Sequence, residues 1–276
     1  MFPDISAFME RTEKEAETEA DDIALQAAST QFSGFSGQPG DSSHVFVLSI
    51  GGSLFCPSAK PDPVKISKIA ESINRLQGEG FKFAIVVGGG KAARHFVAAA
   101  KANGANNFEQ DEIGIAVTRA NAALFIPLIQ NAYPKVLVDA KDAKLVLSQA
   151  KVPVFGGLIP SFTTDAVGCL IAESLNATFV NLSDVDGIYN ANPKEHENAK
   201  LYTRLDYESL VSLLRVAQSK PGQNLVMDLP AALILKRSKL NAIFLNGNDL
   251  DNFEAAIKGH EFKGTTVSEN SGSAEE

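Results

Sequence analysis

Three short apolar runs of this chain each end in consecutive glycines. A continuous apolar run is typical of a strand buried on both faces of a sheet, and glycine allows a tight turn with close backbone approach. Parallel sheets bind their ligands at the carboxyl ends of the strands. The pattern therefore predicts a crevice lined with backbone amides. The crevice would form at the ends of three strands, each followed directly by glycines. These are residues 45–50 with Gly51 and Gly52, residues 83–87 with Gly88, Gly89 and Gly90, and residues 152–155 with Gly156 and Gly157.

Segments with helical spacing of apolar residues alternate with these runs. Ile66, Ile69 and Ile73, for example, recur as they would on one face of a helix. This alternation predicts an α/β fold, with a mostly parallel sheet sandwiched by helices. Helices are expected at 62–77, 91–102, 111–131, 142–149, 164–175, 206–216, 228–239 and 249–258, and further strands at 136–138, 179–182 and 242–245.

The first 43 residues differ in composition from the rest of the 276-residue chain. They hold nine carboxylates against Arg11 and Lys14, and so carry most of the formal net charge of −8. Serine and glycine dominate residues 33–43, which is typical of a flexible linker. We expect an acidic, mostly disordered extension over residues 1–43, one folded domain over residues 44–268 and a disordered tail over residues 269–276.

Composition excludes several classes of protein. The folded part is close to neutral, so it lacks the basic footprint of a nucleic-acid-binding domain. No charge-free apolar stretch reaches the roughly 18 residues that a membrane-spanning helix needs. The two cysteines, Cys56 and Cys169, show no metal-ligand spacing, and the start of the chain does not read as a secretory signal. These features predict a reduced, cytoplasmic protein without nucleic-acid or membrane partners.

The second glycine loop is followed by two cations, Lys91 and Arg94, at the start of a predicted helix. Free N–H groups and the helix dipole favour a phosphate at such a position, and the two side chains add charge-assisted hydrogen bonds. The segment predicts an oligophosphate clamp, although a tight turn with surface charges would look the same. The dinucleotide fingerprint and the Walker loop do not fit, because residues 103–112 form no second strand and Ile85 stands where a Walker glycine belongs.

A polar segment that begins at Ser183 and Asp184 follows the strand predicted at 179–182. An EF-hand loop is excluded here, because Tyr189 stands where that loop requires glycine. The position at the carboxyl end of a strand predicts a ligand contact, and the Tyr189 ring could stack on an adenine. A simple surface turn is the alternative interpretation.

Taken together, seven segments resemble the amino-acid-kinase superfamily and, within it, the UMP kinases of archaeal type. They span about residues 45–267, and their order and spacing agree with that family throughout. The segments are SIGGS (49–53), VVGGGKAAR (86–94), IGIAVTRANA (113–122), PVFGGLIPSFTTDAV (153–167), SDVDGIYNANP (183–193), MDLPAA (227–232) and GTTV (264–267).

The resemblance implies transfer of the γ-phosphoryl group of ATP, with Mg²⁺, to UMP, giving UDP and ADP in pyrimidine biosynthesis, by a homohexamer. An acceptor phosphate is already anionic, so positioning and charge neutralisation suffice without a general base. The implied catalytic residues are Gly51, Gly52, Ser53, Lys91 and Asp165, and the implied ATP-binding residues are Ser49, Gly90, Arg94, Ser183, Asp184, Tyr189 and Asn192. The residues implied to bind UMP are Gly89, Asp111, Leu158, Ile159, Pro160, Ser161, Phe162, Thr163 and Thr164. Asp228 would orient basic groups or the metal.

Two departures from the family pattern matter most. Many members carry a lysine where this chain has Ser49, so Lys91 or another lysine such as Lys236 would have to supply the missing charge. Asn192 also stands where the family usually has aspartate.

Two alternatives stay open. The same fold could phosphorylate isopentenyl phosphate, acetylglutamate, glutamate or carbamate, and His95 is the nearest candidate for the histidine expected of an isopentenyl-phosphate kinase. The chain could also bind nucleotides without catalysis, because loss of a cation at the phosphates removes several kcal/mol of transition-state stabilisation.

Overall fold

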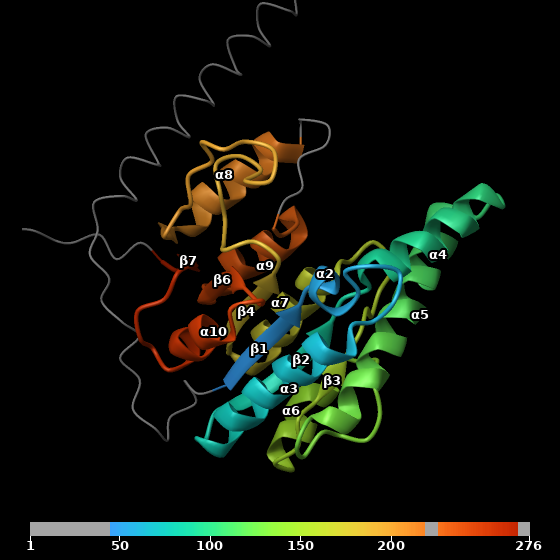
Figure 1. Cartoon of the computed structure of the whole chain (residues 1–276), viewed down its shortest axis with the longest axis horizontal. Helices are drawn as coiled ribbons and strands as arrows, with labels where there is room; N and C mark the ends of the chain where they lie inside the picture. Colours follow the sequence, from blue (N-terminus) through green and yellow to red (C-terminus); the bar gives the residue numbers. More distant parts are fainter. Residues whose placement is uncertain (1–44, 219–225, 270–276) are drawn as a thin grey trace, which may run out of the picture.

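The computed structural model describes residues 45–218 and 226–269 (Figure 1). The acidic extension predicted over residues 1–43 and most of the predicted tail lie outside this part of the chain. A seven-stranded sheet forms its centre, in the order β3-β2-β1-β4-β6-β7-β5. The strands are β1 (Val45–Ile50), β2 (Lys82–Val87), β3 (Val154–Phe155), β4 (Thr178–Ser183), β5 (Arg204–Leu205), β6 (Ala242–Asn246) and β7 (Thr265–Val267).

The strand pairs of this sheet are parallel, apart from β6 and β7, which are antiparallel. This arrangement confirms the predicted α/β fold with a mostly parallel sheet. Side chains of β1 alternate between the two faces, so that Val47 enters one apolar cluster whereas Leu48 enters the other. Both faces are buried, which is why the strands read as continuous apolar runs.

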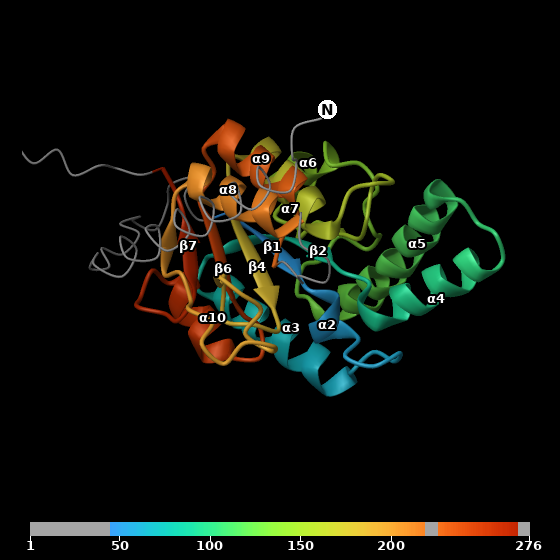
Figure 2. The same cartoon turned by 90° about the horizontal axis from the view of Figure 1, so that it is seen from above.

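Helices cover both faces of the sheet, as Figure 2 shows from above. One face carries α6 (Asp142–Ser148), α7 (Thr164–Leu175), α8 (Tyr207–Gln218) and α9 (Leu229–Ser238), and the other carries α3 (Pro63–Gly78) and α10 (Leu250–Ile257). Helices α4 (Gly90–Ala102) and α5 (Asn107–Phe125) pack on each other and project from the β3 side of the body (Figure 1). The short α2 (Gly52–Phe55) directly follows β1.

Three of the predicted elements need correction. The strand expected at 152–155 is limited to β3, and Val152 makes only an isolated bridge with Ala132. The helix expected at 111–131 begins earlier, where Asn106 and Glu109 form a capping box, and ends at Phe125, with Pro127 in the short 3-10 turn that follows. The strand expected at 136–138 is not formed, and Leu137 makes only an isolated bridge with Phe155. The sequence interpretation also missed β5 and β7, because strands of two or three residues are too short to show periodicity.

Two findings bear on the excluded classes. Among the helices of the described ranges, none combines the length and the apolar character that crossing a membrane requires. Both cysteines are free thiols, and both are buried.

Candidate active site

The glycine loops lie together at one edge of the sheet. Strands β1, β2 and β3 are neighbours and end in register, with Ile50 opposite Val87 and Val86 opposite Phe155. The first two loops interlock, because a Cβ atom on Gly52 would lie 1.9 Å from the backbone N of Gly90. Only glycine fits at this contact, so the predicted meeting of the loops is realised by direct backbone packing.

Helix α4 starts from the second loop. Gly90 has a φ of 62°, in the left-handed region that favours glycine. Lys91 and Arg94 are both exposed in the first turns of α4, and the backbone N–H of Lys91 donates to the Cys56 carbonyl (N–O 3.4 Å). The helix N-terminus and two cations therefore stand beside the Gly52–Gly90 contact, as an oligophosphate clamp requires.

Beneath the loops, a polar cluster joins β1, β4 and α7. Ser49 and Asn181 are register partners on β1 and β4, and both point to the face covered by α7. Ser49 Oγ donates to Asp165 Oδ1 (2.6 Å), and Asn181 Nδ2 donates to the same oxygen (2.8 Å). Ser49 is fully buried. Its predicted contact with ATP stays a prediction, whereas its contact with Asp165 is direct.

The Asp165 carboxyl group is electrostatically unusual. Burial raises its pKa to about 6, the Asp228 carboxylate adds to the rise, and the hydrogen bonds from Ser49 and Asn181 oppose it. Asn181 Oδ1 is buried without a hydrogen-bond partner among the described residues. An unpartnered oxygen beside a partly desolvated carboxyl destabilises a fold, and such polar clusters with shifted pKa values occur most often at functional sites.

The predicted UMP loop, residues 158–164, is tethered at two points. Near its middle, the backbone N–H of Ser161 donates to Asp111 Oδ2 on α5 (2.8 Å), and Ser161 has a φ of 67°. At its end, Thr163 caps α7 and its hydroxyl donates to Asp228, which itself caps α9. Asp111 and the loop of residues 158–164 are thus brought together, as predicted. Within this loop, the side chains of Ile159 and Phe162 are exposed.

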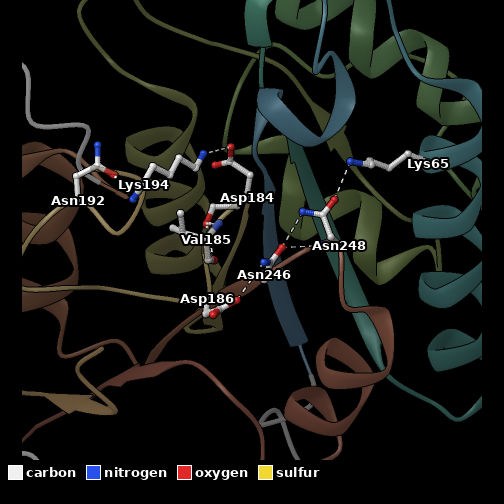
Figure 3. A network of polar contacts seen from close by, with 9 residues as sticks. Lys65, Asp184, Val185, Asp186, Asn192, Lys194, Asn246 and Asn248 are labelled. Carbon is white, nitrogen blue, oxygen red and sulfur yellow. Dashed lines mark hydrogen bonds and ion pairs between the residues drawn. The ribbon is translucent and has the colours of Figure 1, made fainter. Parts of the chain in front are cut away.

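The predicted adenine segment follows β4 (Figure 3). Asp184 forms an ion pair with Lys194 from the far side of its loop, and Asn192 Oδ1 accepts from the Lys194 backbone N–H (3.1 Å). The segment lies next to the first glycine loop, because the Gly51 N–H donates to the carbonyl of Leu182 in β4 (2.8 Å). Lys194, which the sequence interpretation did not consider, is therefore a cation at this edge of the sheet.

Tyr189 contacts Asp186, and the sequence analysis did not predict this contact. Its hydroxyl donates to Asp186 Oδ2 (3.2 Å), and Asp186 also pairs with Lys263 (2.6 Å). The hydrogen bond from the Lys263 ammonium holds the pKa of Asp186 below its ordinary value. With the hydroxyl bound in this way, the Tyr189 ring is held in place beside the loop.

Lys236 is not placed to replace the family lysine. It lies in the last turn of α9, whereas the end of α9 near the site is capped by Asp228, roughly 12 Å away along the helix axis. Its ammonium pairs with Glu208 of α8 (2.6 Å). Lys236 is therefore an unsuitable replacement in this structure, whereas Lys91 directly follows the second glycine loop and Lys194 pairs with Asp184.

The sequence interpretation also missed the role of one face of α5. Thr118, Arg119 and Asn121 hydrogen-bond to the backbone of the second and third glycine loops. The matching segment 113–122 had signalled a resemblance, but nothing in its pattern assigned roles to these side chains.

Glycine loops that meet at one edge of a parallel sheet, beside a helix N-terminus and a shifted aspartate, define a phosphate-binding α/β protein without a Walker motif. A sequence profile of the amino acid kinase family matches residues 44–246. The chain is 40% identical to the uridylate kinase of Thermococcus sibiricus over 223 residues, which cover 80% of this chain and 98% of that one. The uridylate kinase of Methanocorpusculum labreanum is 38% identical and covers 80% and 94%, respectively. This chain belongs to the amino acid kinase family.

Solved structures agree with this assignment. The crystal structure of uridylate kinase from Archaeoglobus fulgidus superimposes with a TM-score of 0.71 at 38% identity, covering 81% of this chain and 99% of that one. UMP kinase from Bacillus anthracis gives a TM-score of 0.69 over 83% and 97% of the two chains, and at 21% identity it supports the fold alone. The predicted family, fold and enzyme class, a phosphotransferase of the kinase type, are confirmed.

Proposed function

We propose that this protein is a UMP kinase, which transfers the γ-phosphoryl group of ATP to UMP and serves pyrimidine nucleotide synthesis. One observation carries the proposal: the interlocked glycine loops stand between a segment suited to the donor and a loop suited to the acceptor. Similarity to uridylate kinases over nearly their whole length supports the choice of acceptor.

The donor side of the site is assigned to the loops of β1, β2 and β4. Here ATP would place its phosphates against Gly51, Gly52 and Ser53 and the start of α4, within reach of Lys91 and Arg94. Its adenosine would lie along the segment of Ser183, Asp184, Tyr189 and Asn192. Lys194 would supply a further charge, because its ammonium already stands beside Asp184.

The acceptor side is assigned to Gly89, Asp111 and the loop of residues 158–164. UMP would place its ribose at Asp111 and its base and phosphate along the loop. Because the phosphate is itself the nucleophile, the protein has to position two anions and neutralise their charge. Asp165 acts near this centre by orienting cationic groups rather than by removing a proton.

Magnesium fits this site as a companion of ATP. Within residues 45–218 and 226–269, no group of three or more His, Cys, Asp or Glu side chains could hold a metal ion. Mg²⁺ is commonly held by one or two carboxylates, waters and the substrate phosphates, and Asp165 and Asp228 offer the two carboxylates. When bound, the ion would neutralise charge on the transferring phosphates.

Assembly and location belong to the same proposal. We expect a cytoplasmic homo-oligomer, a hexamer by family resemblance. Helix α4 has no buried residue, and Phe96 on α4 and Phe108 on α5 are 61% and 63% exposed. Exposed aromatic side chains on a projecting helix pair are typical of an interface between copies. Light scattering at assay concentrations would measure the mass of the assembly.

The proposed acceptor is tested by ADP release from Mg·ATP with UMP, CMP, dUMP, acetylglutamate, carbamate and isopentenyl phosphate. Turnover with UMP should exceed turnover with every other acceptor. A faster reaction with another acceptor would keep the kinase and reject UMP. Binding of both nucleotides without ADP release would favour the alternative of an inactive nucleotide-binding protein.

Asp111→Ala should raise the KM for UMP by about 10-fold or more and leave the KM for ATP within about threefold. The variant loses the proposed ribose contact and the hydrogen bond that holds Ser161. Steady-state kinetics with each substrate varied in turn would measure the split, with Glu112→Ala, the exposed neighbour on α5, as the matched control. A larger effect on the KM for ATP would contradict the acceptor assignment.

A further inference from the structure

One face of α5 connects the glycine loops to one another. The Thr118 hydroxyl accepts a hydrogen bond from the Gly157 N–H (2.6 Å) and donates to the Ile115 carbonyl (2.7 Å). Three residues along the helix, Asn121 Nδ2 donates to the Gly88 carbonyl (2.8 Å). Residues three apart share a helix face, so both side chains point at the same edge of the sheet.

The first glycine loop joins this arrangement through Cys56, which directly follows α2. The Cys56 thiol faces Asn121 Oδ1 (3.8 Å), and the Cys56 carbonyl accepts from the Lys91 N–H. The amide nitrogen of Asn121 therefore binds the second glycine loop, and its amide oxygen contacts the segment that follows the first glycine loop.

The third loop lies directly on the helix. A Cβ atom on Gly156 would stand 2.7 Å from the backbone N of Arg119. Both polar groups of Gly157 are bound by α5, because its carbonyl accepts from Arg119 Nε (3.1 Å) while its N–H donates to Thr118. The start of the loop that leads to residues 158–164 is thus fixed to α5.

Burial makes these contacts effective. Thr118 and Asn121 are only 8% and 5% exposed, so water competes little for their hydrogen bonds. A buried loop N–H or carbonyl that lost its partner would stay unsatisfied, and the loop would shift to recover one. Apolar side chains could fill the same space, so packing alone does not require polar atoms at these two positions. The polar atoms are needed for the hydrogen bonds to the loops.

We infer that Thr118 and Asn121 are positioning residues that hold the acceptor loop and the donor loops at one fixed separation. The inference rests on the proposed kinase function. Both side chains are buried behind the loops and act through Gly157 and Gly88. Phosphoryl transfer depends on near-contact of donor and acceptor, and a misplacement of about 1 Å lowers the rate on the order of 100-fold.

Thr118→Val tests the inference with little change in shape. We expect kcat to fall by about 10- to 100-fold, while the KM values for UMP and Mg·ATP change by less than about threefold. Thr118→Ser, which keeps the hydroxyl, should recover most of kcat. Asn121→Leu should lower kcat with little change in either KM, as Thr118→Val does. The double variant should have a kcat only slightly lower than that of the slower single variant, because both side chains hold the same arrangement of loops.

A matched control separates positioning from general stability. Ser72 is fully buried and its hydroxyl donates to Glu254 Oε1 (2.7 Å), which links α3 to α10 away from the loops. Ser72→Ala should lower the melting temperature and leave kcat unchanged. Wild-type kcat in both Thr118→Val and Asn121→Leu, or a Thr118→Ser variant as slow as Thr118→Val, would overturn the inference.

Hydrogen exchange gives a readout that needs no substrate. The Gly157 amide should exchange faster in Thr118→Val than in the wild type, because it has lost its acceptor. Unchanged exchange at residues 153–164 would overturn the inference even if activity fell. A wild type that does not phosphorylate UMP would reject the proposed function, and exchange would still decide whether these side chains fix the loops.

Discussion

Gly52→Ala should reduce kcat for ADP formation from Mg·ATP and UMP by at least about 100-fold. The added methyl group would lie 1.9 Å from the N and 2.5 Å from the Cα atom of Gly90, and both are backbone atoms that cannot rotate away. The loops of β1 and β2 must then separate at the point where the transferring phosphates are proposed to sit. Overpacking of this kind also lowers the free energy of unfolding, here by about 2 kcal/mol.

The matched control for this substitution is Gly78→Ala. Gly78 ends α3, and a Cβ atom there would meet nothing within 4 Å. Alanine should leave kcat unchanged and stabilise the fold by about 0.5 kcal/mol. Rates from initial-velocity assays and melting temperatures from thermal unfolding would be compared for the two variants. Wild-type kcat in Gly52→Ala would show that the loops need not touch for catalysis.

Asp165→Asn should lower activity and yet stabilise the fold at alkaline pH. The pKa of this carboxyl in the folded state is about 6, above the ordinary 3.8, mainly because of burial. Its contribution to stability is therefore complete below about pH 4 and is lost as pH rises through 6. The neutral amide avoids that loss, which is about 3 kcal/mol by pH 8.

Melting temperatures between pH 4.5 and pH 8 would measure this effect. The difference between variant and wild type should become more positive as pH rises, while kcat at pH 8 falls by about 100-fold. Opposite changes in stability and activity are typical of a residue kept for function. Asp249→Asn is the matched control, because Asp249 caps α10 and asparagine caps equally well. A pH-independent difference would contradict the raised pKa.

Local patterns predicted the elements that position the loops. The strand at 45–50 and the helix at 164–175 appear with the expected bounds, because a buried parallel strand and a helix with a threonine N-cap have strong signals. The prediction of a strand at 136–138 was wrong, because three consecutive apolar residues are as compatible with a loop that packs on Phe155 as with a strand. Hydrogen bonds between distant segments, such as Ser49 to Asp165, leave no periodic trace in the sequence.

The sequence by itself determined the α/β class, the glycine loops at the strand ends and the resemblance to nucleotide kinases. These features depend on spacing and residue type within short segments, and both can be read from the sequence alone. Only the tertiary structure decided that Gly52 and Gly90 touch and that α5 binds the loops through Thr118 and Asn121. It also placed Lys236 at the far end of α9, and set the pKa of Asp165. Contact and burial depend on how distant segments pack, and packing at the scale of one atom is not encoded in any local pattern.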